Sequence, residues 1–339
     1  MKKILFKILR LKKLVSYEIK HKAKVKKRYS FYRKGFLSSN VINYDLLNNS
    51  YTDYLSDYDR FLKAHYINNG KDNIINEKIL FHNYFKDNSL VVKPIGYIFN
   101  RKLLDFETNL PISSSDFLKK QQEDIIVKPS TGGGGGGIVK LKIQDRIDIA
   151  TEKQLNQLTH NNTNYVIQKF ISQTGFCREV FSNSINTIRI LAVKDSSTES
   201  FFIAKAVQRF GTDDSVPADN WTAGGISVDI DLNSGVYKKG AIKPLKGEKS
   251  IKWLSHHPNS NVKFEGEKIL LWENMKEKIL KLSNELFFLN YIGWDVIPME
   301  DGFLVLEANS NSDVNLLQIH GGLLKDQRVK DFYIKHNIL

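Results

Sequence analysis

Three side chains near the C-terminal end of the chain carry oxygen atoms that could bind a metal ion. Asp295 and Glu307 flank a turn signal at residues 300–302, read Glu-Asp-Gly, whose glycine is expected to take a positive φ. In a hairpin centred on this turn, Asp295 lies directly opposite Glu307, and Asn309, two residues further along, shares their face. Facing carboxylates repel each other unless positive charge lies between them, and oxygen ligands without His or Cys suit Mg²⁺, or Mn²⁺, held partly by phosphates. The alternative is an ordinary acidic hairpin.

A run of six glycines forms a second candidate site. Residues 125–141 read IIVKPSTGGGGGGIVKL, in which two strand-like segments flank the glycines. Glycines let the backbone approach a polyphosphate closely and direct N–H groups at its oxygen atoms, and Lys128 would add a point charge. The alternative is a flexible linker. The pattern is not a Walker motif, because the lysine precedes the loop and a strand follows it. The predicted phosphate-binding residues are Lys128, Ser130, Gly132, Gly133, Gly134, Gly135 and Gly136.

These two sites belong to a longer series of motifs that resembles the ATP-grasp superfamily. The resemblance is closest to its subgroup of sugar-transfer-associated ATP-grasp proteins and covers roughly residues 95–325. The matching stretches are VKPSTGGGGGG at 127–137, YVIQKFI at 165–171, SINTIRILAV at 184–193, Arg209 followed by DNWTAGGISVDID at 219–231, the HP pair at 257–258 and GWDVIPMEDGFLVLEANS at 293–310. The resemblance implies an α+β fold in which two lobes clamp ATP under the glycine-rich loop, with Mg²⁺ held by Asp295, Glu307 and Asn309.

The resemblance also implies roles for further side chains. The adenine of ATP would lie at a hinge formed by Gln168, Lys169, Phe170 and Ile171, in which the family usually has Glu in place of Gln168. Arg189 matches a phosphate-proximal arginine that could stabilise the transferring phosphoryl group or bind the acceptor carboxylate. The predicted catalytic residues are Arg189, Arg209, Asn220 and Lys128, of which Arg209 and Asn220 match positions that face the same cavity.

Several assignments stay open at this stage. Arg101 and Lys102 compete for the place of the ATP-binding basic residue on the small lobe. His257 could cap a loop or contact a substrate. His320 is expected to be structural or to lie at the rim of the site, and Cys177 is expected to be a passive thiol.

Composition indicates a globular protein with a reduced cysteine. The chain has 339 residues, of which 41% are hydrophobic, and this is enough for two packed lobes and an extension. One cysteine excludes an intramolecular disulfide and a Cys-rich zinc site, which favours the cytoplasm as the compartment. No segment approaches the roughly 20 apolar residues of a membrane span. Lysines interrupt the apolar residues at the N-terminus, so no signal peptide is expected.

The positive charge of the chain is concentrated at its N-terminus. The net charge is +13, and residues 1–35 contain fourteen Lys or Arg against the single acidic residue Glu18, which also gives +13. Four apolar side chains of this segment share one face of a predicted helix: Ile4, Ile8, Leu11 and Val15. This face could lie on an anionic membrane surface or pack on the body of the enzyme. An acidic polysaccharide is a further candidate partner, whereas the sequence lacks nucleic-acid-binding signatures, so no nucleic acid is expected.

The motifs divide the chain into three parts. Residues 1–90 are predicted to form a basic, mainly helical extension, residues 91–170 the small lobe with the glycine-rich loop, and residues 171–339 the large lobe with the metal and acceptor sites. Alternating strands are predicted from Tyr165 onward, each half-buried in a sheet. A helix is predicted from Trp272 to Leu289, with its apolar residues on one face.

The sequence and the resemblance together predict an ATP- and Mg²⁺-dependent carboxylate–amine ligase that acts through an acyl phosphate. A thiol is a possible alternative to the amine. The expected substrate is a uronic acid or other sugar carboxylate, linked to a lipid or a nucleotide, in surface-polysaccharide or capsule biosynthesis at the inner face of the membrane. One alternative is an ATP-grasp kinase that phosphorylates a sugar or an alcohol. The other is a non-catalytic nucleotide-binding component of a glycan assembly complex.

Overall fold

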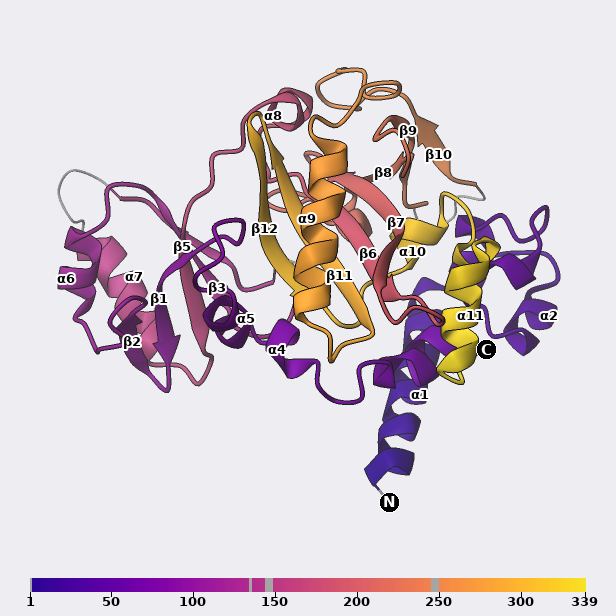
Figure 1. The fold of residues 1–339 in the computed structure, drawn as a ribbon, viewed down its shortest axis with the longest axis horizontal. Coiled ribbons are helices and arrows are strands. Elements are labelled where there is room, and N and C mark those ends of the chain that lie inside the picture. Colours follow the sequence, from indigo (N-terminus) through magenta and orange to yellow (C-terminus); the bar gives the residue numbers. More distant parts are fainter. Residues whose placement is uncertain (1, 134–135, 144–148, 245–249) are drawn as a thin grey trace.

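The computed structural model of the protein describes residues 2–133, 136–143, 149–244 and 250–339. In this part of the chain two antiparallel sheets lie side by side, with helices packed on them (Figure 1). The smaller sheet has the strand order β2-β1-β5-β3-β4, with β1 Pro94–Phe99, β2 Lys102–Asp105, β3 Ile125–Pro129, β4 Val139–Leu141 and β5 Tyr165–Lys169. The larger sheet has the order β10-β9-β8-β7-β6-β11-β12, with β6 Ile188–Lys194, β7 Phe201–Phe210, β8 Ile226–Ile230, β9 Tyr237–Ile242, β10 Lys252–Leu254, β11 Tyr291–Met299 and β12 Gly302–Asn309.

The smaller sheet is covered by α6 (Ser114–Lys119) and α7 (Ile149–Thr159). Ser113 begins α6, because its Oγ accepts a hydrogen bond from the backbone N–H of Asp116 at 3.1 Å. The core under these helices includes Ile98, Phe117, Ile125, Val127, Leu155 and Ile167. Since side chains alternate along a strand, the inward positions of Ile125 and Val127 direct Ile126 and Lys128 to the opposite face of β3.

The larger sheet is buried on both faces. Helix α9 (Trp272–Glu285) covers one face with Met275, Ile279 and Leu282, and the Trp294 indole donates a hydrogen bond to Ser283 Oγ at 2.9 Å. The predicted helix at this position is therefore confirmed, although it ends at Glu285. Helices α10 (Asn315–Gln318) and α11 (Gln327–Lys335), with the 3₁₀ turn η5 (Leu323–Lys325), cover the other face. The central strands β6 and β8 are consequently almost entirely buried, so the prediction that each strand is half-buried was wrong for them.

The hairpin of β11 and β12 contains a β-bulge. Met299 pairs with Gly302 and Val296 with Val305, but the next pair is Asp295 with Glu307, because one extra residue lies in β12 between the two pairs. Without the bulge the residue opposite Asp295 would be Leu306. Gly302 is not among the glycines with positive φ, so the turn conformation expected from the sequence was wrong, whereas the predicted pairing of Asp295 with Glu307 is confirmed.

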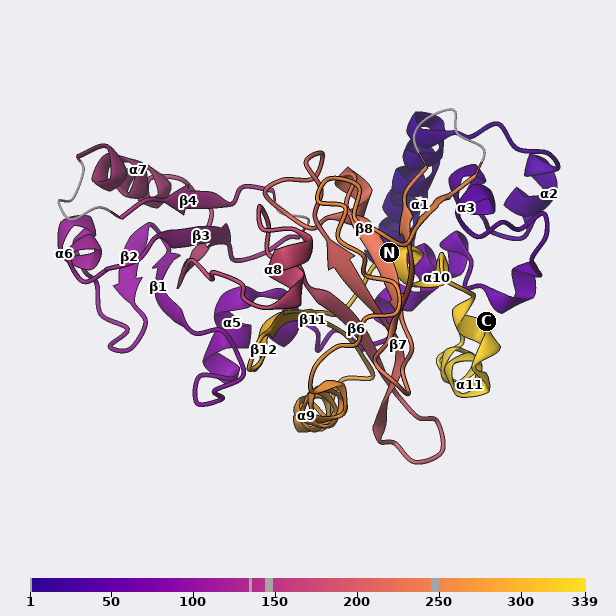
Figure 2. The ribbon, with the colours of Figure 1, turned by 90° about the horizontal axis from the view of Figure 1, so that it is seen from above.

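The N-terminal segment is mainly helical, and most of it packs on the two lobes. Its elements are α1 Lys2–His21, α2 Arg28–Arg33, α3 Ser38–Asn43, η1 Tyr51–Asp53, η2 Asp59–Lys63, η3 Ala64–Tyr66, α4 Asn73–Asn76 and α5 Lys78–Tyr84. Phe81 and Phe85 belong to the same core as Trp294, and Val92 N donates a hydrogen bond to Val305 O at 3.0 Å. The domain limits deduced from the sequence stay a prediction. Figures 1 and 2 place α2 at one end of the molecule and the smaller sheet at the other, with α1 and the larger sheet between them.

Candidate active site

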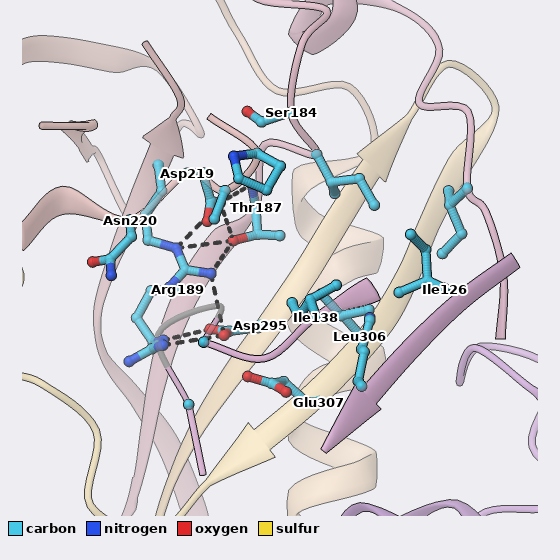
Figure 3. A pocket seen from close by; sticks show the side chains of 18 of the residues that line it. Ile126, Ile138, Ser184, Thr187, Arg189, Asp219, Asn220, Asp295, Leu306 and Glu307 are labelled. Atoms are coloured by element: carbon cyan, nitrogen blue, oxygen red, sulfur yellow. Dashed lines mark hydrogen bonds and ion pairs between the residues drawn. The ribbon is translucent and has the colours of Figure 1, made fainter. Parts of the chain in front are cut away.

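A pocket of about 810 Å³ lies between the two sheets. The smaller sheet contributes Ile126, Lys128, Lys140 and Gln168. The charged side chains shown in Figure 3 come from the larger sheet and, for Asp219, from the segment between β7 and β8. All described members of the predicted site except Ser130 line this pocket: Lys128, Gly132, Gly133, Gly136, Gln168, Lys169, Phe170, Ile171, Arg189, Arg209, Asn220, Asp295, Glu307 and Asn309. Ser130 is buried behind the loop, and its backbone N–H bonds to Asn164 O. Gly134 and Gly135 lie outside the described residues.

Strand register places three charged side chains in a row across the larger sheet. Arg189 on β6 is the partner of Asp295 on β11, and Asp295 is the partner of Glu307 on β12. Residues paired across neighbouring antiparallel strands direct their side chains to the same face, and Figure 3 shows these three together at the wall of the pocket. The positive charge next to the facing carboxylates is thus a guanidinium group.

Asp295 is the centre of a network of ion pairs and hydrogen bonds. It is 2% exposed. Its Oδ1 accepts a hydrogen bond from Arg189 Nε at 2.5 Å, and its Oδ2 accepts from Arg189 Nη2 and Arg209 Nη2, each at 3.1 Å. Arg189 Nη1 also donates to Ser312 Oγ at 2.7 Å. The two arginines are therefore held side by side at the pocket by one carboxylate.

A second buried carboxylate positions Arg209 from the other side. Asp219 Oδ2 lies 3.3 Å from Arg209 Nε and accepts hydrogen bonds from the backbone N–H and the hydroxyl of Thr187, at 2.8 and 2.6 Å. Thr187 Oγ1 in turn accepts a hydrogen bond from Arg209 Nε at 2.9 Å. Arg209 Nη1 makes no hydrogen bond to the described residues, which leaves one end of the guanidinium available to a ligand in the pocket.

The network favours the charged forms of Asp295 and Arg189 despite their burial. Burial by itself would raise the pKa of Asp295, but Arg189 and Arg209 outweigh this effect and hold the pKa below its usual range. Burial would lower the pKa of Arg189, and Asp295 raises it above its ordinary value. Burial raises the pKa of Asp219, and Arg209 offsets only part of that rise.

The three predicted metal ligands form a donor set that fits a hard cation. A carboxylate has about four lone-pair positions, and Asp295 uses three of them for arginine donors, so Oδ1 keeps one. Glu307 is partly exposed, with Lys78 Nζ at 3.5 Å, and the Asn309 side-chain amide has a buried Nδ2 without a partner among the described residues. In the described ranges no three His, Cys, Asp or Glu side chains converge, and Asn309 is the third ligand predicted here. The metal role of these residues stays a prediction.

Two lysines lie on the side of the pocket that has the glycine-rich loop, and they face the large lobe across it. Lys128 lines the pocket, and burial, with a smaller contribution from Lys78, lowers its pKa to about 8 although Glu307 acts in the opposite direction. Lys78, at the start of α5, donates a hydrogen bond to the carbonyl of Gly132 at 2.9 Å. Neither Arg101 nor Lys102 lines the pocket, and Arg101 instead donates to Asn162 Oδ1. Lys78 is therefore a basic residue at the pocket where one of those two residues was expected.

At the hinge the side chain of Gln168 is fixed by a buried histidine. Gln168 Nε2 lies 3.2 Å from His82 Nε2 and 3.4 Å from the carbonyl of Val92. Burial, followed by the nearby Lys128 and Lys78, lowers the pKa of His82 to about 3, so its ring is neutral and Nε2 can accept from the amide. This arrangement uses the Gln168 nitrogen and leaves its oxygen as an acceptor.

The structure assigns structural roles to several other predicted residues. Asn220 lines the pocket, but its Oδ1 caps η4 (Trp221–Ala223) by accepting from the Thr222 N–H. His257 caps a loop, since Nε2 bonds to Gly211 O at 2.7 Å and Nδ1 accepts from two backbone N–H groups. His320 is partly buried and bonds to Ser227 Oγ at 3.0 Å. Burial raises the pKa of Cys177 to about 12, which suits a passive thiol.

Four residues of the site were not predicted from the sequence: Thr187, Asp219, Ser312 and Lys78. Two of them could have been identified from the sequence. Thr187 lies two residues before Arg189 and so shares its face of the strand, and Asp219 directly precedes Asn220 in a matched stretch. Lys78 is 50 residues before Lys128, and no local pattern connects it with the glycine-rich loop.

Comparison with known proteins gives a family match and several similar solved structures. The family model described as sugar-transfer associated ATP-grasp matches residues 59–331. The fold is similar to the ATP-grasp ligase PsnB complexed with a minimal precursor, at 15% identity and a TM-score of 0.38 over 74% of this chain and 57% of that chain. It is also similar to D-alanyl-alanine synthetase A from Vibrio cholerae, at 11% identity and a TM-score of 0.43 over 81% of this chain and 66% of that chain. A third similar structure is the VanG D-Ala:D-Ser ligase from Enterococcus faecalis, at 11% identity and a TM-score of 0.41 over 80% of this chain and 63% of that chain.

The chain thus spans 57–66% of the length of these three structures. A search of curated proteins found no match to the sequence. The predicted α+β fold with two lobes is confirmed. ATP-grasp proteins as a whole are mostly ATP-dependent carboxylate–amine ligases. From the match over residues 59–331 and the two-sheet architecture, the chain belongs to the sugar-transfer associated ATP-grasp family.

Proposed function

We propose that the protein is an ATP- and Mg²⁺-dependent carboxylate–amine ligase that acts through an acyl phosphate. The observation that carries this proposal is the pairing of two unlike walls around one pocket. One wall has the glycine-rich loop with Lys128 and Lys78, which suit phosphate groups, and the other has the row Arg189, Asp295 and Glu307. A pocket of about 810 Å³ has room for a nucleotide and a small acceptor together.

In this proposal each wall acts on a different part of the reaction. Lys128, Lys78 and the backbone of the loop bind the phosphates of ATP, and Gln168 accepts a hydrogen bond from the adenine amino group. An acceptor carboxylate oxygen attacks the γ-phosphorus, the bond to the bridging oxygen breaks, and ADP leaves. The equatorial oxygens gain negative charge in this transition state, which Arg189 stabilises. Arg209 holds the acceptor carboxylate through its unpaired Nη1.

Asp295, Glu307 and Asn309 would hold Mg²⁺, which when bound would neutralise negative charge on the phosphates. The amine then attacks the carbonyl carbon of the acyl phosphate. An amide forms, inorganic phosphate leaves, and the amine loses a proton. The pocket is walled by both sheets, which limits the access of water to the acyl phosphate.

For the acceptor we propose a sugar carboxylate such as a uronic acid, carried on a nucleotide or a lipid, in surface-polysaccharide or capsule synthesis. The family name connects the chain with sugar transfer, and this supports a sugar-derived substrate. A lipid-linked acceptor would place the enzyme at the cytoplasmic face of the membrane. None of the described helices is both long enough and apolar enough to cross a bilayer.

Product analysis tests the ligase proposal and identifies the acceptor. The protein is incubated with ATP, Mg²⁺, a panel of nucleotide-linked uronic acids and a panel of amines, and ADP, inorganic phosphate and product mass are measured. A ligase releases phosphate in step with ADP and forms an amide, and hydroxylamine in place of the amine gives a hydroxamate. A phosphorylated sugar would identify a kinase instead. ATP binding without ADP formation for any acceptor would support a non-catalytic nucleotide-binding component.

A further inference from the structure

The N-terminal helix α1 is attached to the body of the protein along one face. Leu14 is 7% exposed, and Arg10 Nε donates a hydrogen bond to the carbonyl of Phe61 at 2.5 Å. One turn further on, Glu18 accepts hydrogen bonds from the backbone N–H of Ser38 at 3.0 Å and from its hydroxyl at 2.5 Å. The spacing of residues 10, 14 and 18 is that of a single helical face, so these contacts fix the rotation of α1 about its axis.

A different face of α1 presents apolar side chains to solvent. These side chains are Ile8, Leu11, Val15 and Ile19, with 46%, 44%, 50% and 74% of their surfaces exposed, and we call them the α1 stripe. At about 100° per residue they fall within about 80° of the helix circumference and extend over about 17 Å. The sequence left open whether Ile8, Leu11 and Val15 pack on the body, and in the structure they do not. The side chain of Ile4, the fourth residue predicted for this face, is outside the described side chains.

The surroundings of the α1 stripe are basic. Lys12, Lys13 and Lys20 are exposed on the helix, and the loop that follows α1 adds the exposed residues Lys22, Lys24, Lys26 and Lys27. Glu18 is the one acidic residue among residues 1–35, and it is turned toward the body, where it also accepts a hydrogen bond from the Tyr32 hydroxyl at 2.6 Å. An apolar strip with lysines on the helix and after it, and without an exposed carboxylate, is the pattern of a helix that lies in the plane of an anionic membrane surface.

We propose that the α1 stripe and its lysines dock the protein on the surface of an anionic lipid bilayer. A bilayer surface satisfies both features, because the aliphatic side chains enter the acyl boundary while the lysines meet the lipid headgroups. A nucleic acid would satisfy the charges alone, since Ile, Leu and Val have no ring to stack on a base. In Figures 1 and 2 α1 lies beside the larger sheet and well apart from the smaller sheet, and no described residue of α1 lines the pocket, so docking through α1 does not occupy the pocket. This inference does not rest on the ligase proposal.

Vesicle cosedimentation of the full-length protein tests the docking surface. The vesicles contain phosphatidylcholine alone or phosphatidylcholine with phosphatidylglycerol, at low and at high salt. We expect binding only with phosphatidylglycerol, and weaker binding at high salt because exposed charges are screened.

Two triple variants test the two features of the docking surface. The first replaces apolar residues of the α1 stripe and is Leu11→Ser/Val15→Ser/Ile19→Ser. Its control is Leu110→Ser/Ile149→Ser/Ile334→Ser, at exposed apolar positions elsewhere. The second is Lys12→Glu/Lys13→Glu/Lys20→Glu, with Lys153→Glu/Lys268→Glu/Lys281→Glu as a control at exposed lysines.

Both α1 variants are expected to lose at least about tenfold in vesicle affinity, while both control variants stay within about twofold of the unchanged protein. Circular dichroism and ATP binding show that each variant is folded. Equal binding to both kinds of vesicle, or equal losses in the control variants, would overturn the proposal. So would binding of duplex DNA that is lost in the lysine variant and kept in the serine variant, or a dimer that the serine variant dissociates without any change in vesicle binding.

Discussion

Asp295 shows how a single buried residue can have two roles in one site. From the sequence, Asp295 and Glu307 are two repelling carboxylates, and removing either one should relieve strain. In the structure Asp295 neutralises two buried or half-buried guanidinium groups, whereas Glu307 is partly exposed beside Lys78. The two carboxylates are therefore expected to contribute differently to stability, although both belong to the proposed metal site.

Alanine substitutions separate these contributions. Asp295→Ala leaves Arg189 without its charge partner, so we expect a loss of about 3–5 kcal/mol in the free energy of unfolding. Glu307→Ala should cost less than about 1 kcal/mol, because its ion pair with Lys78 is partly exposed. Both variants should lose ADP formation. Urea unfolding followed by circular dichroism checks the difference, and similar stabilities would contradict the assigned network.

We expect Lys128 to make the binding of ATP depend on pH. A lysine is charged below its pKa, and the pKa of Lys128 is lowered to about 8, so the positive charge that binds phosphate is lost as pH rises through about 8. We expect the KM for ATP to rise between about pH 7.5 and 9.5. Lys128→Arg keeps its charge over this range and should flatten the profile. If the KM for ATP depends on pH in the same way in the unchanged protein and in Lys128→Arg, a group other than Lys128 causes the pH dependence.

His82 is expected to control the choice of base through Gln168. In His82→Leu the amide loses the nearer of its two acceptors and keeps only the Val92 carbonyl at 3.4 Å, so it can rotate and no longer presents only its oxygen to the base. Loss of one hydrogen bond of about 1 kcal/mol should lower the preference for ATP over ITP, whose base has a carbonyl in place of the amino group, about fivefold. The ratio of the two kcat/KM values measures this effect. His160→Leu, at an exposed position, is the control, and an unchanged ratio in His82→Leu would rule out the positioning role.

At the scale of elements, the helices and strands with a regular apolar spacing could be predicted from the sequence, whereas local irregularities such as the β-bulge could not. The apolar spacing of residues 272–289 indicated α9, and the strand-like segments on either side of the glycines are β3 and β4. The bulge that brings Glu307 opposite Asp295 has no signature of its own in the sequence, because it depends on pairing between strands. Burial of β6 and β8 on both faces could not be predicted either, since it depends on helices distant in sequence.

The attachment of α1 depends on Glu18. Glu18→Ala removes the acceptor of hydrogen bonds from the Ser38 backbone, the Ser38 hydroxyl and the Tyr32 hydroxyl. We expect α1 to separate from α3 more often, so trypsin should cleave after Lys20 or Lys22 several times faster than in the unchanged protein. ADP formation should stay the same. Ser16→Ala, on the exposed side of α1, is the matched control and should be cleaved at the original rate.

At the scale of the whole molecule, the site exists only where the two lobes meet. The glycine-rich loop and the metal-type carboxylates could be identified separately because each is compact in sequence. Their partners Lys78 and His82 could not, since they come from a segment that the sequence indicated only as an extension and that the fold inserts between the lobes. Chemistry at this junction requires ATP and the acceptor to be held together, which is the central claim of the ligase proposal.

Transfer of labelled oxygen tests this claim most directly. The acceptor identified by product analysis is prepared with oxygen-18 in its carboxylate and incubated with ATP, Mg²⁺ and the amine. If an acyl phosphate forms, one carboxylate oxygen becomes bonded to phosphorus and leaves with it when the amine attacks the carbonyl carbon. We therefore predict one oxygen-18 atom in each inorganic phosphate released. Inorganic phosphate without the label, formed together with ADP, would contradict the ligase mechanism.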